Sequence, residues 1–284
     1  MRRGLVVVTV LAAVTTGACT DDGREGMVVQ GTPPATPYSG RLDIPAREQD
    51  EYSQEAIRQA SGAAGRALEC DTGIFHGNGP DGWNESDGGD TPEDGLALYF
   101  DLFTPQVPRQ GYRVERREAD RVLYSYDVGG RTKVAVVVAK DQRDRPGWGP
   151  ETSASCDPAE LPEGVGDDEW YEIWTDSDGR RLPVAEIHTS TGPEHCNWQS
   201  ARFLDLGRHP DRRTYVRDPH GVLARDMLTT PYDGDARLPA DARDTGYRHQ
   251  DWQLWLTDDP TTAYVRTPDG VEAWPALRED VACY

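Results

Sequence analysis

The sequence predicts an α+β fold, in which N-terminal helices pack on an antiparallel meander and a β-rich second domain follows. Residues 51–68 are rich in Ala, Glu, Gln and Arg, which favour helix. Short runs rich in Val, Tyr and Trp then alternate with Gly, Asp and Pro, as expected of antiparallel strands. The 284 residues are enough for two modest hydrophobic cores.

The first domain is expected to span residues 51–160. Its first helix covers residues 51–68, where alanines at helical spacing form one flat face. A second helix begins at Pro92, because proline suits the first turn and acidic residues follow it, and it continues through Phe103. Three strands are expected at residues 112–117, 121–126 and 132–139, and a fourth ends near Cys156.

The second domain is expected to span residues 165–284 and to contain no long helix. The boundary is placed at residues 157–168, a segment rich in Pro, Gly and Asp. Turn signals such as Asp-Ser-Asp-Gly at 176–179 separate the candidate strands. These strands are residues 170–175, 182–188, 198–206, 214–216, 252–256 and 263–265.

Two short segments of this domain have similar sequences. Residues 214–222 read TYVRDPHGV and residues 263–271 read AYVRTPDGV. Proline followed by glycine two residues later is typical of a hairpin turn, so both segments are expected to form antiparallel hairpins. Val216 and Val265 would then face the core, with Arg217 and Arg266 on the wetter face.

The N-terminus has the features of a secretory signal peptide. Arg2 and Arg3 precede the uncharged segment 4–14, which is too short to span a bilayer. Small residues then lead to Cys19, which resembles the lipobox of bacterial lipoproteins, although Thr16 stands where leucine is usual. The prediction is a signal peptide at residues 1–18 and lipidation of Cys19 by fatty acyl chains such as palmitate. The alternative is plain cleavage after Ala18, which leaves Cys19 free.

Cysteine parity supports lipidation. The chain has five cysteines, and an odd thiol in an exported protein needs an explanation. If Cys19 is acylated, four remain for two disulfides. The domain boundary favours the pairs Cys70–Cys156 and Cys196–Cys283, each within one domain.

Composition limits the location and the partners. Residues 19–50 are rich in Gly, Pro, Thr and Asp, which predicts a disordered tether between the lipidated cysteine and the folded part. Removal of residues 1–18 leaves 28 basic and 50 acidic residues, a net charge of −22. Such a charge repels phosphate backbones, so nucleic acid is excluded as a partner. The lipid-anchored chain is expected on the outer face of the cell membrane.

No segment carries a recognisable catalytic, cofactor or metal motif, so none of these sites is predicted. Residues 77–82 match G-x-G-x-x-G but lack the strand and helix of a dinucleotide site, which favours a surface loop. The acidic segment 81–94 leaves calcium open, although its order does not match an EF-hand. His195 beside Cys196 suggests a thiol and base, but adjacent strand residues point to opposite faces. Trp170, Trp174, Trp252 and Trp255 are read as core first and as a glycan or protein contact second.

Three segments carry a family resemblance: the Cys19 region, the Glu-Cys and SCDPAELP segments at 69–70 and 155–162, and the stretch from PEHCNW through YVRDPHGVL to LPADARDTG. The chain resembles uncharacterised exported lipoproteins of high-GC Gram-positive bacteria, which implies a location and no mechanism.

The favoured function is a binding or interaction role in the cell envelope, with a glycan or an envelope protein as partner. The alternatives are an envelope hydrolase or glycan-modifying enzyme, and a spacer without ligand. A deep pocket that gathers histidine and carboxylates would favour the enzyme.

Replacing Cys19 by serine tests the anchor. Without the thiol no thioether to lipid can form, so Cys19→Ser should leave unprocessed precursor or release the protein into the medium. Membrane fractionation and the intact mass of the mature N-terminus measure this. Identical fractionation of both proteins, with no lipid mass on the wild type, would contradict lipidation.

Overall fold

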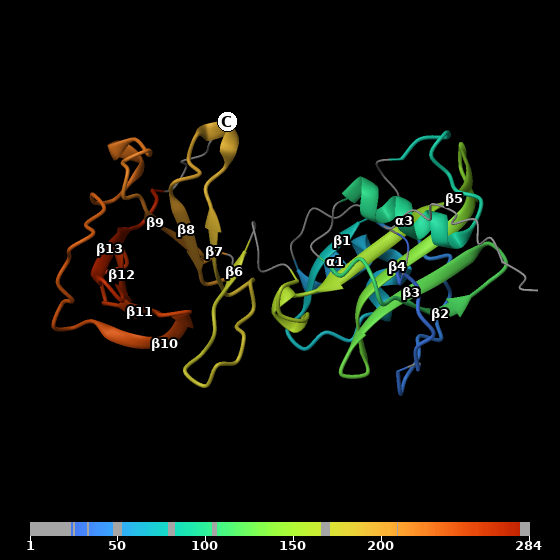
Figure 1. Cartoon of the computed structure of the whole chain (residues 1–284), viewed down its shortest axis with the longest axis horizontal. Coiled ribbons are helices and arrows are strands. Elements are labelled where there is room, and N and C mark those ends of the chain that lie inside the picture. The colour runs from blue at the N-terminus through green and yellow to red at the C-terminus, as the bar shows by residue number, and fades with distance from the viewer. Residues whose placement is uncertain are drawn as a thin grey trace, which may run out of the picture.

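The computed structural model describes residues 24, 26–32, 34–47, 53–78, 83–103, 107–165, 171–208 and 210–278. Strand accounts for 39% of the structure and helix for 15%, which confirms a mixed α+β class dominated by antiparallel sheet. Figure 1 shows two modules side by side, the first built from β1–β5 and the second from β6–β13. The predicted signal peptide, Cys19 and Cys283 lie outside the described residues. None of the described helices is both long and apolar enough to cross a bilayer.

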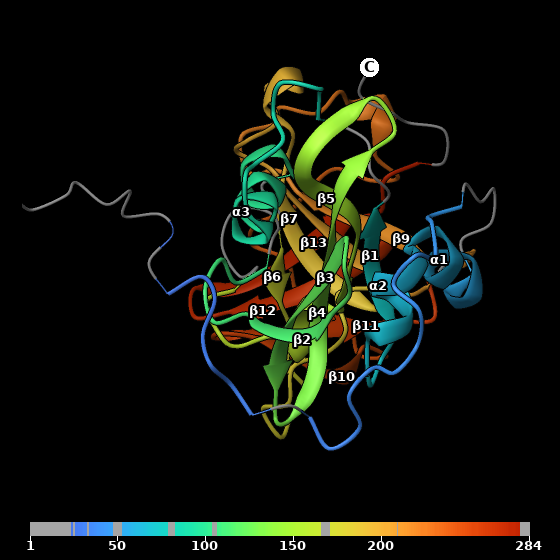
Figure 2. The same cartoon turned by 90° about the vertical axis from the view of Figure 1, so that its right-hand side faces the viewer.

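The first module is a five-stranded antiparallel sheet covered by helices on both faces (Figure 2). Residues 132–139 were predicted as a strand, and they form the centre of β4. Val134, Val136 and Val138 point to the α3 face, whereas Ala135 and Val137 point to the α2 face. The sheet order is β1-β5-β4-β3-β2. The elements are α1 (Gln54–Ala60), α2 (Gly62–Ala67), β1 (Ile74–Asn78), α3 (Pro92–Phe103), β2 (Arg113–Arg117), β3 (Arg121–Val128), β4 (Arg131–Gln142) and β5 (Arg145–Cys156).

The single helix predicted at residues 51–68 is wrong, because the segment forms two short helices. The chain breaks at Gly62, whose φ is +52°, a conformation that disfavours a side chain. A Cβ at this position would lie 2.4 Å from the carbonyl oxygen of Ile44. The close approach of residues 44–45 therefore requires glycine here. The second predicted helix is confirmed as α3, where Thr91 and Asp94 cap each other's backbone N–H groups.

The disordered tether predicted at residues 19–50 is also wrong for residues 26–32 and 34–47. Met27 and Leu42 are buried in the two cores of the first module. Val28 forms a parallel bridge with Tyr112, and the backbone N–H of Tyr38 donates to Glu115. Composition missed this, because a few well-placed apolar residues and backbone hydrogen bonds suffice to fix a polar segment against an existing sheet.

The disulfide Cys70–Cys156 is formed, as predicted, and links the segment before β1 to the end of β5. Cys196 is also disulfide-bonded. Its predicted partner, Cys283, lies outside the described residues. A buried Lys133 next to the first disulfide donates to the carboxylates of Asp71 and Glu160 at 2.8 and 2.6 Å.

The second module consists of two four-stranded antiparallel meanders, β6-β7-β8-β9 and β10-β11-β12-β13. A core around Trp174, Leu204, Val265 and Trp274 lies between them. The predictions found six of the strands, β11 with its observed bounds and the other five with shifted bounds. They included β13 only as the second arm of the hairpin expected at residues 263–271, and they missed β10. The strands are β6 (Glu172–Ile173), β7 (Ile187–Thr191), β8 (Arg202–Leu206), β9 (Arg213–Arg217), β10 (Arg243–His249), β11 (Trp252–Leu256), β12 (Thr262–Thr267) and β13 (Gly270–Pro275). Short 3₁₀ turns lie at η1 (Pro158–Glu160), η2 (Glu194–Cys196) and η3 (Arg225–Met227).

The two similar segments, residues 214–222 and 263–271, share a turn, but only the second forms a hairpin. β12 and β13 form the predicted hairpin, with Thr267 opposite Gly270. After β9 the chain turns but does not return as a strand. The carboxylate of Asp218 accepts the backbone N–H groups of Val222 and Leu223, which are therefore not available to pair with β9. Val216 and Val265 are fully buried, as expected. Arg217 instead turns inward and forms a bidentate pair with Glu272.

The two modules meet at the carboxylate of Asp157, immediately after β5. Its Oδ1 accepts the backbone N–H groups of Ala159 and Val184, both at 2.9 Å, and Oδ2 accepts that of Ala185 at 3.2 Å. Arg181 adds a hydrogen bond to the carbonyl of Leu161. The junction is therefore fixed by hydrogen bonds of one buried carboxylate and one arginine.

Two glycine-to-alanine variants test whether residues 44–45 are docked. Gly129 has a φ of +60° with nothing within 4 Å of an added Cβ, so Gly129→Ala should cost about 1 kcal/mol of backbone strain. Gly62→Ala adds the clash with Ile44 and should cost about 2–4 kcal/mol. Urea denaturation measures both. Equal penalties would show that residues 44–45 are not held against α2.

Candidate functional site

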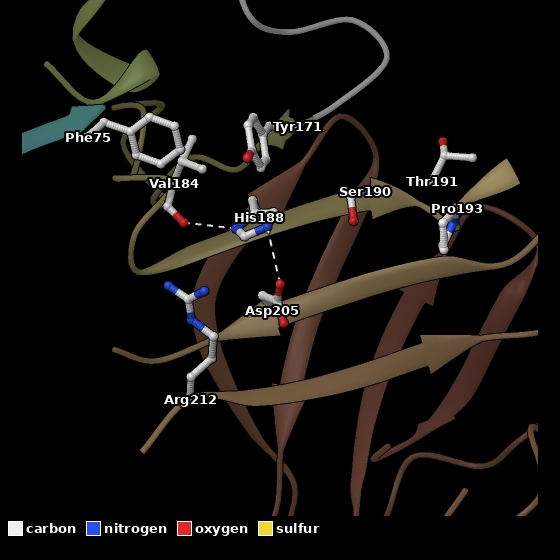
Figure 3. A pocket seen from close by; sticks show the side chains of 9 residues that line it. All are labelled: Phe75, Tyr171, Val184, His188, Ser190, Thr191, Pro193, Asp205 and Arg212. Carbon is white, nitrogen blue, oxygen red and sulfur yellow. Dashed lines mark hydrogen bonds and ion pairs between the residues drawn. The ribbon is translucent and has the colours of Figure 1, made fainter. Parts of the chain in front are cut away.

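A cavity of about 410 Å³ lies at the junction of the two modules (Figure 3). One wall comes from the first module, where Phe75 projects from the edge strand β1. The floor is the outer face of β7 and β8. The lining residues are Phe75, Tyr171, Val184, His188, Ser190, Thr191, Pro193, Asp205 and Arg212.

A row of three polar side chains crosses β7, β8 and β9, and the first two of them line the floor of the cavity. His188, Asp205 and Thr214 are direct cross-strand neighbours on β7, β8 and β9. Since alternate residues of a strand face opposite sides, the apolar neighbours Ile187 and Leu204 enter the core while these three face outward. His188 Nε2 lies 3.3 Å from Asp205 Oδ2, and the Thr214 hydroxyl donates to Asp205 Oδ1.

Both ring nitrogens of His188 are engaged. Nδ1 lies 2.8 Å from the carbonyl oxygen of Val184, which can only accept, so Nδ1 carries a proton. Nε2 faces the carboxylate of Asp205 (Figure 3). With Nδ1 donating to Val184 and Nε2 directed at Asp205, neither nitrogen presents a lone pair to the neighbouring Ser190.

The electrostatics of the row favour an ionised Asp205. Burial alone would raise the pKa of Asp205, but the hydrogen bonds from His188 and Thr214, together with the charges of His188 and Arg212, outweigh it and lower this pKa. Burial raises the pKa of Tyr171, and the Arg212 charge opposes this rise. The Tyr171 hydroxyl is therefore a neutral donor at physiological pH.

Aromatic rings connect the two walls of the cavity. Phe75 meets Tyr171 edge-to-face with ring centroids 5.6 Å apart, and Tyr171 meets His188 edge-to-face at 4.9 Å. Phe75 belongs to the first module and His188 to the second. The aromatic contacts thus span the junction and leave an apolar rim beside the polar floor.

Arg212 is the exposed cation at this cavity, and it follows the turn between β8 and β9. Among the described residues, no hydrogen bond or ion pair engages its guanidinium. Its charge acts on both Tyr171 and Asp205.

Sequence reasoning missed this site. The alternation Ile187, His188, Thr189, Ser190 was the local signal for polar side chains on an outward strand face, but nothing local pointed to Phe75 or Arg212.

The segments singled out in the sequence lie elsewhere. Gly77 and Asn78 are part of β1, so the surface loop predicted at 77–82 is wrong for these two residues; positions 79–82 lie outside the described part. Within the described part of the acidic segment, Asp94 is engaged by Thr91 and Arg24. No three histidine, cysteine or carboxylate side chains in the described ranges converge as a metal site.

The thiol–base pair considered at His195 and Cys196 is not formed, because Cys196 is disulfide-bonded. Trp174 is fully buried in the core of the second module. Trp252 lies against Trp274 and beneath the guanidinium groups of Arg202 and Arg217. The interpretation of these tryptophans as core is therefore confirmed for Trp174; position 170 lies outside the described residues.

No protein-family profile matches the chain, and neither a curated protein nor a solved structure shows significant similarity to it.

Replacing Asp205 by asparagine tests the charged row through its pH dependence. A carboxyl whose pKa is lowered by folding stabilises the protein above its ordinary range near pH 4, and this stabilisation is lost as the pH falls through the folded pKa. Asp205→Asn should therefore cost about 1–3 kcal/mol at pH 7. The penalty should shrink below about pH 4.

Urea denaturation between pH 3 and pH 7 measures this difference, and the exposed Asp251→Asn is the control. A penalty for Asp205→Asn that does not change with pH would contradict an ionised Asp205.

Proposed function

We propose that the chain is a lipid-anchored, extracytoplasmic binding protein of the cell envelope, which holds a small polar ligand in the cavity between its modules. The observation that carries this proposal is the engagement of both nitrogens of His188 beside Arg212, whose guanidinium pairs with no other residue that the structure describes. Such a site offers hydrogen-bond donors and charge for recognition, but no free general base.

The location is supported by the signal-like N-terminus and by cysteine chemistry. The Cys70–Cys156 disulfide is typical of an oxidising compartment outside the cytoplasm. Because residues 26–32 and 34–47 belong to the folded part, only residues 20–25 separate Cys19 from it. Seven peptide units extend to at most about 25 Å, so a lipidated Cys19 would hold the first module close to the membrane surface.

The alternative of a hydrolase has one observation in its favour. Ser190 shares the outward face of β7 with His188, next to Asp205, so three residue types of a serine hydrolase lie in one cavity. In such a triad one imidazole nitrogen faces the carboxylate and the other accepts the serine proton. Here the second nitrogen donates to the Val184 carbonyl. The geometry therefore supports binding over nucleophilic catalysis.

Activity-based probes distinguish the two functions. Since His188 does not present a free nitrogen to the Ser190 hydroxyl and Cys196 is disulfide-bonded, fluorophosphonate and iodoacetamide probes should leave the non-reduced, folded protein unlabelled. A commercial serine protease in the same reaction is the positive control. Stoichiometric fluorophosphonate labelling that Ser190→Ala abolishes would establish the hydrolase and overturn the binding function.

A further inference from the structure

We infer that the ligand of this cavity is a sugar that carries a carboxylate. This inference rests on the proposed binding function and adds the chemical class of the ligand. Three features of the cavity carry it: a guanidinium that pairs with no other described residue, a carboxylate whose two oxygens are already engaged, and an apolar rim beside hydroxyl groups.

The guanidinium of Arg212 selects an anionic group. It is exposed at the cavity, and in the described part of the chain it makes no hydrogen bond or ion pair. A planar guanidinium binds a carboxylate through two parallel N–H···O bonds, a geometry that adds directional specificity to charge. Arg217 shows this pairing in the same module, where it binds both oxygens of Glu272 at 2.7 and 2.8 Å.

Asp205 does not pair with Arg212, because both of its oxygens are engaged by other side chains. Its Oδ2 faces His188 and its Oδ1 accepts from Thr214. Both Asp205 oxygens are therefore engaged by neighbouring side chains of the sheet, and no hydrogen bond or ion pair joins them to Arg212 among the described residues. The positive charge of Arg212 therefore remains for a ligand.

One uncompensated cation suits a monoanion. A chain with 50 acidic and 30 basic residues repels anions at long range, so a polyphosphate or a nucleic acid would need several arginines to overcome this field. A single carboxylate needs only one bidentate partner.

The rest of the cavity fits a sugar ring. Phe75 and the Tyr171 ring supply an apolar rim, against which the C–H face of a pyranose can pack. Ser190 and Thr191 contribute hydroxyl groups that can both donate to and accept from ring hydroxyls. The volume of about 410 Å³ lies at the lower end of small-molecule sites, which corresponds to one or two sugar rings.

The test compares D-glucuronate with D-glucose, two rings that differ in a single carboxylate, by titration calorimetry on the full lipidated chain in detergent. The wild type should bind glucuronate at least about tenfold more tightly than glucose, because only glucuronate engages Arg212. Arg212→Gln should reduce glucuronate affinity to that of glucose.

Arg213→Gln is the matched control. It removes the same charge one residue away, on the opposite face of β9, and should leave the preference unchanged. Phe75→Ala should weaken both sugars by a similar factor, because the aromatic rim contacts the ring that they share.

The outcomes separate the ligand class from the binding function. Equal affinity for glucose and glucuronate in the wild type, or an equal loss in Arg212→Gln and Arg213→Gln, would overturn carboxylate recognition and leave binding in place. Binding of inorganic phosphate in preference to glucuronate would assign the site to a phosphate, free or in a lipid headgroup. The absence of binding for both sugars would overturn the sugar class, and the activity-based probes decide independently whether the cavity binds or catalyses.

Discussion

The arrangement of the cavity depends on one buried carboxylate, that of Asp157. It accepts three backbone N–H groups, one from its own 3₁₀ turn and two from Val184 and Ala185 in the second module. The same Val184 presents its carbonyl to His188, and His188 in turn holds Asp205. Burial raises the pKa of Asp157 while these three donors oppose the rise. A continuous chain of hydrogen bonds thus leads from the end of β5 to the floor of the cavity.

The opposite wall is fixed from the same turn. Glu160, the last residue of η1, accepts the backbone N–H groups of Asp71 and Thr72 and the ammonium of Lys133. These contacts, together with the disulfide Cys70–Cys156, set where β1 begins and therefore where Phe75 stands. Removing either member of this buried, hydrogen-bonded Lys133–Glu160 pair would leave an uncompensated charge, which disfavours any arrangement that separates them. The carboxylates of Asp157 and Glu160, three residues apart in the chain, therefore position the two walls of the cavity.

The sequence predicted what local patterns encode. The valine run of β4, the capped start of α3 and the Cys70–Cys156 pair were all recognisable from composition, spacing and parity. β10 was missed because its residues are mostly polar and the strand is bulged against β11. The break at Gly62 depends on the approach of Ile44, and the docking of Leu42 depends on a sheet whose residues extend to Ala154, 112 positions later in the chain. The cavity was unpredictable for the same reason, because Phe75, His188 and Arg212 become neighbours only through the junction.

A site built across a junction links recognition to the relative placement of the modules. Phe75 comes from the first module, whereas His188, Asp205 and Arg212 come from the second, so a ligand that contacts both walls binds only the arrangement that Asp157 maintains. By mass action, a ligand specific for that arrangement stabilises it in proportion to the logarithm of its concentration over its dissociation constant. The catalytic alternative would need a free imidazole nitrogen, and the hydrogen bond from His188 to the Val184 carbonyl removes it. The same hydrogen bond therefore fixes His188 in the floor of the cavity and favours ligand binding over base catalysis.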